Sequence, residues 1–215
     1  MAQRERIRRR PREEIRGELL AAAARVFASR GFHGASVDAI SEDAGLSTGA
    51  IYSNFKGKED LFLSLYEQRI ERRRTELRSA VERAGGGQAG LAAASAEVAE
   101  ALGREREWFL LYFEFALHAA RDPAFARRFR KLRQAGLREL QGGLSDGLEN
   151  VGLEPPLLAI ELARGLRALS YGLALDRLVG DGREPEELFG RVAELIFTGL
   201  AAQSKTSQAR RARTG

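Results

Sequence analysis

The chain has 215 residues, 44% of them hydrophobic, so it is long and apolar enough to bury a core. It contains no cysteine, which excludes disulfide bonds and thiolate metal sites. The longest apolar run, residues 108–117, is interrupted by Glu114 and is too short to span a bilayer. No apolar stretch with a cleavage site follows the arginine-rich start, so we expect no secretory signal and no membrane partner. These features together favour a soluble protein of the cytoplasm.

The net charge of +5 is concentrated at the two ends of the chain. Residues 1–12 carry six arginines and one glutamate, the last eleven residues carry four cations and no acid, and the remainder has a net charge of −4. Basic tails are commonly solvated and disordered, which we expect of residues 204–215. A basic arm at residues 1–12 could equally enter a DNA minor groove, and the arm residues considered for this role are Arg9, Arg10 and Arg12.

Helical periodicity of apolar residues runs through the whole chain, and no stretch alternates as a β-strand does. Glycines and prolines mark the predicted helix ends, and GGGQAG, residues 85–90, is a predicted flexible loop. The predicted helices cover residues 12–30, 36–44, 47–55, 58–84, 91–102, 104–121, 123–150, 156–179 and 186–203. The sequence therefore predicts an all-α protein, in which an N-terminal three-helix domain precedes a larger helical domain.

Residues 36–55 have the pattern of two short helices joined by a tight turn. Ser36 is the predicted N-cap of the first helix, Gly45 makes the turn, and Ser47 is the predicted cap of the second. Helical spacing directs Ala50, Ile51 and Phe55 inward and leaves another set facing outward: Thr48, Gly49, Tyr52 and Ser53. Such a pattern is typical of a helix-turn-helix that places its second helix in the DNA major groove.

Lys58 lies in the first turn of the helix predicted at 58–84, where a cation opposes the helix dipole. A DNA phosphate beside Lys58 would explain this position. The alternative is that the neighbouring Glu59 and Asp60 simply offset the charge.

Two runs, AAAARVFASRGFHGASVDAI and AGLSTGAIYSNFKGKEDLF, resemble the DNA-binding domain of the tetracycline-repressor (TetR) family of bacterial regulators. The resemblance spans residues 13–73. It implies base contacts from Thr48, Gly49, Tyr52 and Ser53, and phosphate contacts from Ser36, Tyr52, Asn54 and Lys58. The predicted DNA-binding set is completed by Ser47, Ala50, Arg9, Arg10 and Arg12.

Three positions depart from the TetR pattern. Gly57 stands where a serine usually caps the following helix, and Asp38 stands where the residue is often neutral or basic. The recognition helix, residues 47–55, contains no arginine, so the bidentate contact that most often reads guanine cannot come from it. We expect specificity to rest on small hydroxyls, on Tyr52 and on the arm.

Aromatic residues gather in the helix predicted at 104–121, although only 7% of the chain is aromatic. Core packing is the simplest interpretation for at least half of them. The TetR resemblance implies a second one, because members of that family bind small effectors among their central helices, and apolar walls suit a small molecule. The candidate lining residues are Tyr66, Trp108, Phe109, Tyr112, His118, Phe129 and Tyr171.

Glu114, His118 and Asp122 follow one another at intervals of four, which places them on one helical face. Such a row could anchor an effector or a metal ion. The alternative, which we prefer, is a solvated row in which Asp122 caps the next helix. The sequence shows no Ser/His/Asp set, no cysteine nucleophile and no phosphate-binding loop, so we predict no enzyme activity, no metal and no cofactor.

The last two predicted helices combine leucines with glycines at helical spacing, which indicates either internal packing or a close contact with a second chain. The TetR resemblance implies a four-helix homodimer interface here, within an effector-binding and dimerisation domain at residues 74–203. We therefore predict a homodimeric repressor that binds a palindromic double-stranded DNA operator and is released by an unknown small-molecule effector. The alternatives are a small-molecule or metal-binding helical protein with weakened DNA readout and, more remotely, a helical enzyme.

Overall fold

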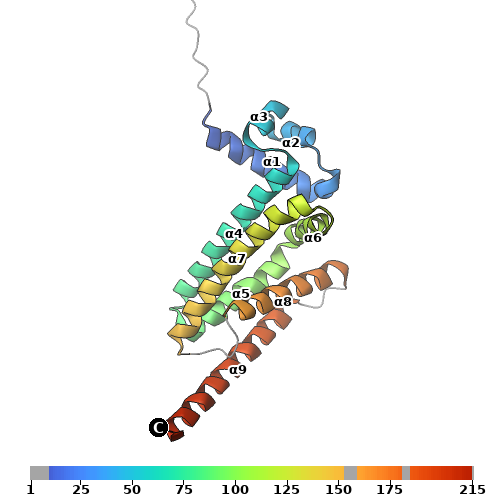
Figure 1. Ribbon diagram of the computed structural model, residues 1–215. Coiled ribbons are helices and arrows are strands. Elements are labelled where there is room, and N and C mark those ends of the chain that lie inside the picture. The colour runs from blue at the N-terminus through green and yellow to red at the C-terminus, as the bar shows by residue number, and fades with distance from the viewer. Residues whose placement is uncertain (1–9, 153–158, 181–184, 215) are drawn as a thin grey trace, which may run out of the picture. The chain divides into compact units, whose positions relative to one another are not determined.

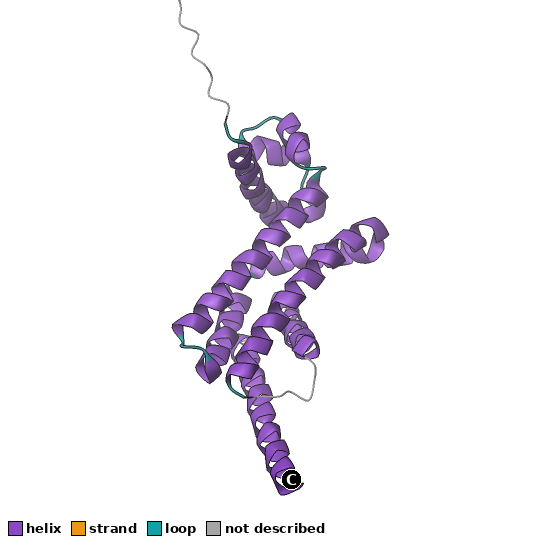
Figure 2. Cartoon of the chain, turned by 60° about the vertical axis from the view of Figure 1, so that its left-hand side comes forward, coloured by secondary structure: helices purple, strands orange, loops and turns teal. Residues whose placement is uncertain are grey.

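The computed structural model describes residues 10–152, 159–180 and 185–214. These residues form α-helices and no strand, which confirms the all-α prediction (Figure 2). The chain divides into two compact units, residues 1–67 and residues 68–215. No helix among the described residues is long and apolar enough to cross a membrane.

The first unit contains α1 (Arg12–Gly34), α2 (Val37–Ala44), α3 (Thr48–Asn54) and the start of α4 (Lys58–Arg83) (Figure 1). Helices α1, α2 and α3 pack against one another in all three pairs. Their apolar positions recur every three or four residues, so each helix directs one stripe into a shared core. The largest fully buried side chains of this core are those of Leu19, Phe27, Phe32, Ile40, Ile51, Leu61 and Phe62.

Two glycines shape the path of the chain in the first unit. Gly45 ends α2 in the left-handed conformation, with φ of 63°, and its N–H bonds the carbonyls of Ser41 and Glu42. This is the predicted turn between the two short helices. Gly31 also has a positive φ, of 66°, and makes a kink inside α1. Helix α1 therefore continues to Gly34, four residues beyond the predicted end at Arg30, by bending at this glycine rather than ending there.

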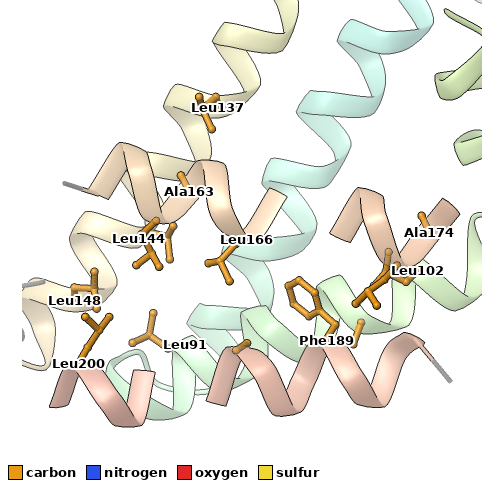
Figure 3. Close-up of a cluster of buried hydrophobic side chains, with 14 of the residues drawn as sticks. Leu91, Leu102, Leu137, Leu144, Leu148, Ala163, Leu166, Ala174, Phe189 and Leu200 are labelled. Atoms are coloured by element: carbon orange, nitrogen blue, oxygen red, sulfur yellow. The ribbon is translucent and has the colours of Figure 1, made fainter. Parts of the chain in front are cut away.

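The second unit contains the rest of α4 together with α5 (Gly87–Arg104), α6 (Arg106–Arg121), α7 (Pro123–Asn150), α8 (Ala159–Val179) and α9 (Pro185–Thr214). Helix α5 packs against α7, α8 and α9, and α8 also packs against α6, α7 and α9. Leucines, alanines and two phenylalanines, Phe109 and Phe189, fill the space between these helices. Figure 3 shows part of this cluster. Burial of this apolar cluster is the main force that holds the unit together.

The predicted loop at residues 85–90 is shorter than expected. Gly85 and Gly86 have positive φ values of 79° and 73° and bond back to the last turn of α4, so these two glycines alone end that helix. Helix α5 then begins at Gly87. Gly90 lies inside α5, where a Cβ atom would lie 3.0 Å from Cγ1 of Val81 on α4. This glycine therefore allows two helices to approach closely rather than making a loop.

The last helix also differs from the prediction. Helix α9 continues to Thr214, whereas the sequence pattern places its end at residue 203 and predicts a disordered basic tail beyond it. Residues 204–214 contain neither proline nor glycine, and seven of these eleven residues are alanine, glutamine, lysine or arginine. These residues have high helix propensity, so nothing in the sequence interrupts the helix once it has formed.

Substitution of Gly45 by alanine should lower the free energy of unfolding by about 1–2 kcal/mol, because an L-residue resists the left-handed conformation. The matched control is Gly17→Ala in α1, where a Cβ atom meets nothing within 4 Å and should raise stability by up to about 1 kcal/mol. Urea unfolding of both variants measures the difference. Equal effects of the two substitutions would contradict the role assigned to the Gly45 turn.

Candidate nucleic-acid interface

Helix α3 presents one buried and one exposed side. Ile51 is fully buried and Phe55, at the end of the helix, is 2% exposed, whereas Tyr52 is 62% exposed. A helix of 7 residues is too short to be stable alone, so the two buried side chains hold it against α1 and α2. The exposed side of α3 is thereby kept in a defined position at the surface of the first unit.

An open groove of ≈ 770 Å³ lies between the exposed side of α3 and the N-terminal end of α1. It is lined by Arg10, Arg12, Ile15, Ser47, Gly49, Ala50, Ser53 and Asn54. Every one of these residues except Ile15 belongs to the predicted DNA-binding set. Residues that are 32 to 44 positions apart in the sequence therefore meet in one concave surface. Arg9, the remaining arm residue of that set, lies outside the described residues.

Two arginines of α1 form hydrogen bonds to the C-terminal end of α3. Arg12 donates from Nε to Oδ1 of Asn54 (3.2 Å) and from Nη2 to the carbonyl of Ser53 (3.1 Å). Arg16 donates to the carbonyl of Asn54 (3.2 Å) and to Oγ of Ser64 (2.9 Å). The Arg16 guanidinium also lies 4.2 Å from the centre of the Phe55 ring. Sequence reasoning missed Arg16, although its spacing of four from Arg12 places both arginines on one face of α1.

Thr48 does not project freely outward as helical spacing predicts. Its hydroxyl lies 3.2 Å from Oδ1 of Asp38 and 3.2 Å from Oγ of the buried Ser41, both on α2. The Asp38 carboxylate, which the sequence analysis treats as a departure from the TetR pattern, thus orients a residue of α3. A base contact from Thr48 stays a prediction, and it would have to share the hydroxyl with these partners.

Ser53 and Asn54 are engaged within the first unit as well. The Ser53 hydroxyl donates to the carbonyl of Gly49 (2.7 Å), and Nδ2 of Asn54 donates to the carbonyl of Ala50 (2.8 Å). Such bonds to the preceding turn of a helix are common for short polar side chains. Each side chain retains hydrogen-bonding capacity, since a hydroxyl has acceptor lone pairs and an amide has a second N–H.

Only one of the two predicted serine caps is formed by its side chain. The Ser36 hydroxyl accepts a hydrogen bond from the N–H of Ala39 (3.1 Å), as predicted. Ser47 occupies the N-cap position of α3, but its side chain makes no capping bond. The reason is that the N–H of Ala50 bonds the Ser47 carbonyl at 2.9 Å instead. The exposed Ser47 hydroxyl lines the groove described above.

Lys58 has partners inside the first unit that its sequence position does not reveal. Its ammonium donates to the carbonyls of Phe32 (3.0 Å) and Ala35 (3.2 Å) at the end of α1, and lies 4.4 Å from the centre of the Phe32 ring. Carbonyls at the end of a helix attract a cation, so the position of Lys58 is explained without a DNA phosphate. An ammonium has three N–H groups, and one of them is left for a phosphate contact.

The cations around α3 are not neutralised by ion pairs. Among the described residues, Arg12, Arg16 and Lys58 bond only neutral oxygens. Arg10 is different, because it pairs with Glu14 and Glu18 on α1. The three uncompensated charges make this surface attractive to a polyanion, although the body of the chain is net acidic.

Four of the predicted pocket residues meet in the second unit. The rings of Tyr112 on α6 and Tyr171 on α8 stack with their centres 4.3 Å apart. Phe129 on α7 lies 6.0 Å from the Tyr112 ring, and Phe109 lies 6.2 Å from the Tyr171 ring. Phe109, Tyr112 and Phe129 are buried and Tyr171 is half-buried. These four residues are called the aromatic cluster below.

The other predicted pocket residues have different surroundings. The half-buried Trp108 packs against the apolar core, with the Arg69 guanidinium 5.7 Å from its ring centre. His118 lies 4.8 Å from the ring of Phe125, which in turn stacks on Phe129 of the aromatic cluster. Tyr66 belongs to the first unit, where its buried ring lies 6.1 Å from that of Phe62.

Asp122 caps α7, which is the simpler of the two interpretations of the Glu114, His118 and Asp122 row. Its carboxylate accepts hydrogen bonds from the N–H groups of Ala124 (2.7 Å) and Phe125 (3.0 Å). These bonds to Phe125 and Ala124 lower the pKa of Asp122, because they favour its charged form. Pro123 follows at the first helical position, where its missing N–H costs little.

Comparison with known proteins matches both units. The family model described as bacterial regulatory proteins of the tetR family matches residues 19–65. The model of the C-terminal part of BetI-type transcriptional repressors matches residues 87–203, which is more than half of the chain. The chain belongs to the TetR family. The resemblance seen in the sequence is thereby confirmed, and the match includes the helix-turn-helix and all of α3.

Individual TetR relatives are similar over a short part of the chain. The chain is 41% identical over 61 residues to the HTH-type transcriptional activator FasR of Mycolicibacterium smegmatis, which covers 28% of each chain. It is 48% identical over 50 residues to the HTH-type transcriptional repressor AcnR of Corynebacterium diphtheriae, covering 23% of this chain and 26% of AcnR. The matched segments thus span about a quarter of these curated relatives.

A solved structure extends the likeness along the chain. The structure of a transcriptional regulator from Rhodococcus sp. Rha1 superposes with a TM-score of 0.65 at 26% identity, and the match covers 86% of this chain and 96% of that one. The all-helical architecture of this TetR protein is therefore shared with a solved regulator over most of its length.

Replacement of Lys58 by methionine should lower the free energy of unfolding by about 1–3 kcal/mol, because two carbonyls at the end of α1 lose a charged donor. Lys56→Met is the matched control, since Lys56 is exposed and none of the hydrogen bonds or ion pairs described here involves its side chain. Chemical unfolding followed by circular dichroism measures both. A Lys58→Met protein as stable as the Lys56→Met protein would show that these bonds do not hold the first unit together.

Proposed function

We propose that this TetR protein is a DNA-binding transcriptional regulator that acts as a homodimer on a palindromic operator and is released from it by a small-molecule effector. The observation that carries the proposal is the groove beside α3. It combines an exposed helix face with Arg12, whose guanidinium bonds only neutral oxygens among the described residues, and Arg16 adds a second such charge on the same face of α1. A regulator of this kind acts where the DNA lies, in the cytoplasm.

The proposed roles of the residues follow from their exposure. Tyr52 and Gly49, both exposed on α3, contact bases, and the absence of a side chain at Gly49 lets the backbone approach the DNA. Ser47 and Ser53 contribute hydroxyls along the same face. Phosphate contacts come from Ser36, Asn54 and the third N–H of Lys58, and the arm arginines reach the minor groove.

The direction of regulation is proposed from the second unit. The relatives that match over a short part of the chain include both an activator and a repressor, so these matches do not discriminate between them. The match over residues 87–203 is to the C-terminal part of transcriptional repressors, which supports a repressor. In this proposal α4 transmits the effector signal, since it begins in the first unit and continues into the second. A coupling free energy of about 1–3 kcal/mol would suffice for the switch.

The proposed dimer interface is an outer stripe on α8 and α9. Small and apolar residues recur there at helical spacing on the side of each helix that faces away from the core. All of them are exposed: Gly165, Ala168, Gly172, Leu175 and Val179 on α8, and Leu188, Leu195 and Gly199 on α9. Val179 is 78% exposed and Leu195 is 71% exposed. A contiguous apolar surface of this kind is typical of a protein interface.

The glycines of the outer stripe support the same proposal. A Cβ atom added at Gly165, Gly172 or Gly199 would meet nothing within 4 Å in this chain. Packing within the chain therefore gives no reason for a residue of low helix propensity at these positions. A second copy of the chain, related by a twofold axis, would explain these glycines, because helices cross closely at small residues. Such a dimer would place two α3 helices about 34–36 Å apart, one turn of DNA.

Selection from random double-stranded DNA should enrich a palindrome, and Tyr52→Ala should weaken binding to it by about 10-fold or more, as expected for loss of a central contact. The matched control is Leu117→Ala, since Leu117 is 59% exposed but lies on α6 in the second unit. Gel-shift titration measures affinity, and thermal melting verifies that both variants fold. Unchanged affinity of Tyr52→Ala, or selection without a palindrome, would refute the proposed docking of α3.

Leu195→Glu should convert the dimer into a monomer, because it places a carboxylate in a contact from which water is excluded. Leu117→Glu introduces the same charge at a comparably exposed leucine outside the outer stripe and should leave the dimer intact. Light scattering coupled to gel filtration gives the mass of each protein. A Leu195→Glu protein that stays dimeric at low micromolar concentration would place the interface elsewhere.

A further inference from the structure

Arg133 occupies an unusual position for a charged residue. It lies on α7 four residues after Phe129 and four before Leu137, and both of these side chains are buried. Residues spaced by four share one face of a helix, so Arg133 lies on the face that α7 turns toward the core. Arg130, Lys131 and Arg138 are exposed on the rest of the helix, which is the usual place for a cation.

Two aromatic rings lie beside Arg133. Its guanidinium carbon lies 5.9 Å from the ring centres of both Tyr112 and Phe129. Its Nε is buried and has no hydrogen-bond partner. Within the described part of the chain, Arg133 forms no ion pair with a carboxylate. The Arg133 side chain is half-buried, and contact with the two rings offsets only part of the cost of removing its Nε from water.

A second guanidinium lies beside the first. Nη1 of Arg167, on α8, donates to the backbone carbonyl of Arg133 at 3.0 Å, and Arg167 likewise forms no ion pair with a described residue. Both arginines act electrostatically on Tyr112, and Tyr171 is hydrogen-bonded to it. Burial, reinforced by Tyr171, nevertheless raises the pKa of Tyr112, so this side chain stays a neutral phenol and cannot supply the missing negative charge.

We infer that the aromatic cluster and Arg133 form a binding site for an anionic small molecule with a flat, apolar body. The guanidinium of Arg133 takes the carboxylate or phosphate of this molecule, for which its planar fork is well suited. The rings of Tyr112, Tyr171, Phe109 and Phe129 contact the body. Arg167 reinforces the positive potential. This inference rests on the proposed function, because it gives the chemical class of the effector.

The same geometry excludes the opposite class of ligand. A cluster of aromatic rings alone would also suit a quaternary ammonium ion, since the ring faces attract cations. Here Arg133 already faces two of the rings, so a cationic ligand would meet like charge at close range. Arg133 therefore selects for the charge of the ligand, and the rings select only for its shape.

The first test needs no ligand. Arg133→Met should melt at a higher temperature than the unsubstituted protein, because it replaces a half-buried guanidinium, whose buried Nε has no hydrogen-bond partner, by an apolar side chain of similar length. Arg130→Met is the matched control on the exposed side of α7 and should leave the melting temperature nearly unchanged. If Arg133→Met instead melts well below Arg130→Met, Arg133 holds the fold together and the inference is wrong.

The second test measures binding by calorimetry on the full protein without DNA, with phenylacetate, phenyl phosphate and the neutral phenylacetamide as probes. We expect at least one anion to bind about 10- to 100-fold more tightly than the amide, which is the worth of a charge-assisted contact. Arg133→Met should abolish this preference, Arg133→Lys should restore part of it, and Arg130→Met should retain it. Preference for phenylacetate over phenyl phosphate would identify a carboxylate, and the reverse a phosphate.

The result that overturns the inference is equal binding of the amide and both anions, or no binding of either anion at millimolar concentration. Operator release is scored separately, by repeating the gel shift with the anion that binds. An anion that binds through Arg133 without weakening the operator complex would confirm the site and refute the effector-controlled part of the proposed function. Absence of anion binding together with normal operator binding would refute the site, and the DNA-binding part of the proposed function would stand.

Discussion

The anchoring of α3 by two buried side chains is the constraint on which the candidate interface depends. Ile51 and Phe55 are almost completely excluded from water, and the 7-residue helix has too few backbone hydrogen bonds to persist without them. Arg16 reinforces this anchor by binding the last turn of α3 and covering the Phe55 ring. The exposed Tyr52 therefore projects from a helix whose position is set by packing beneath it.

Positive charge at the interface is supplied by neighbouring elements rather than by α3 itself. The helix contains no arginine or lysine, yet Arg12, Arg16 and Lys58 surround it from α1 and α4. Each of these cations bonds neutral oxygens, so it positions the backbone without losing its charge to an ion pair. The same contacts thus serve folding and an attraction for a polyanion, and we expect substitutions there to change stability and affinity together.

In the second unit, the inner and outer faces of the helices differ in how their apolar residues are used. The inner faces of α5, α7, α8 and α9 bury leucines, alanines and phenylalanines, whereas the outer stripe of α8 and α9 exposes apolar residues and glycines at which an added Cβ atom would meet nothing within 4 Å. Arg133 breaks the apolar pattern of an inner face. Natural proteins accept such local costs mainly at sites of function, and the interface and ligand site are both proposed from departures of this kind.

The sequence by itself determined the all-α class, the helix-turn-helix at residues 36–55 and most helix ends, because apolar periodicity and glycine positions are local signals. The sequence also identified seven of the residues that line the groove and all four residues of the aromatic cluster. Contacts between distant segments were decided only by the tertiary structure. No local pattern reveals that Lys58 meets the end of α1, that Thr48 turns toward Asp38, or that Arg133 lies beside two aromatic rings, since each depends on how separate helices pack.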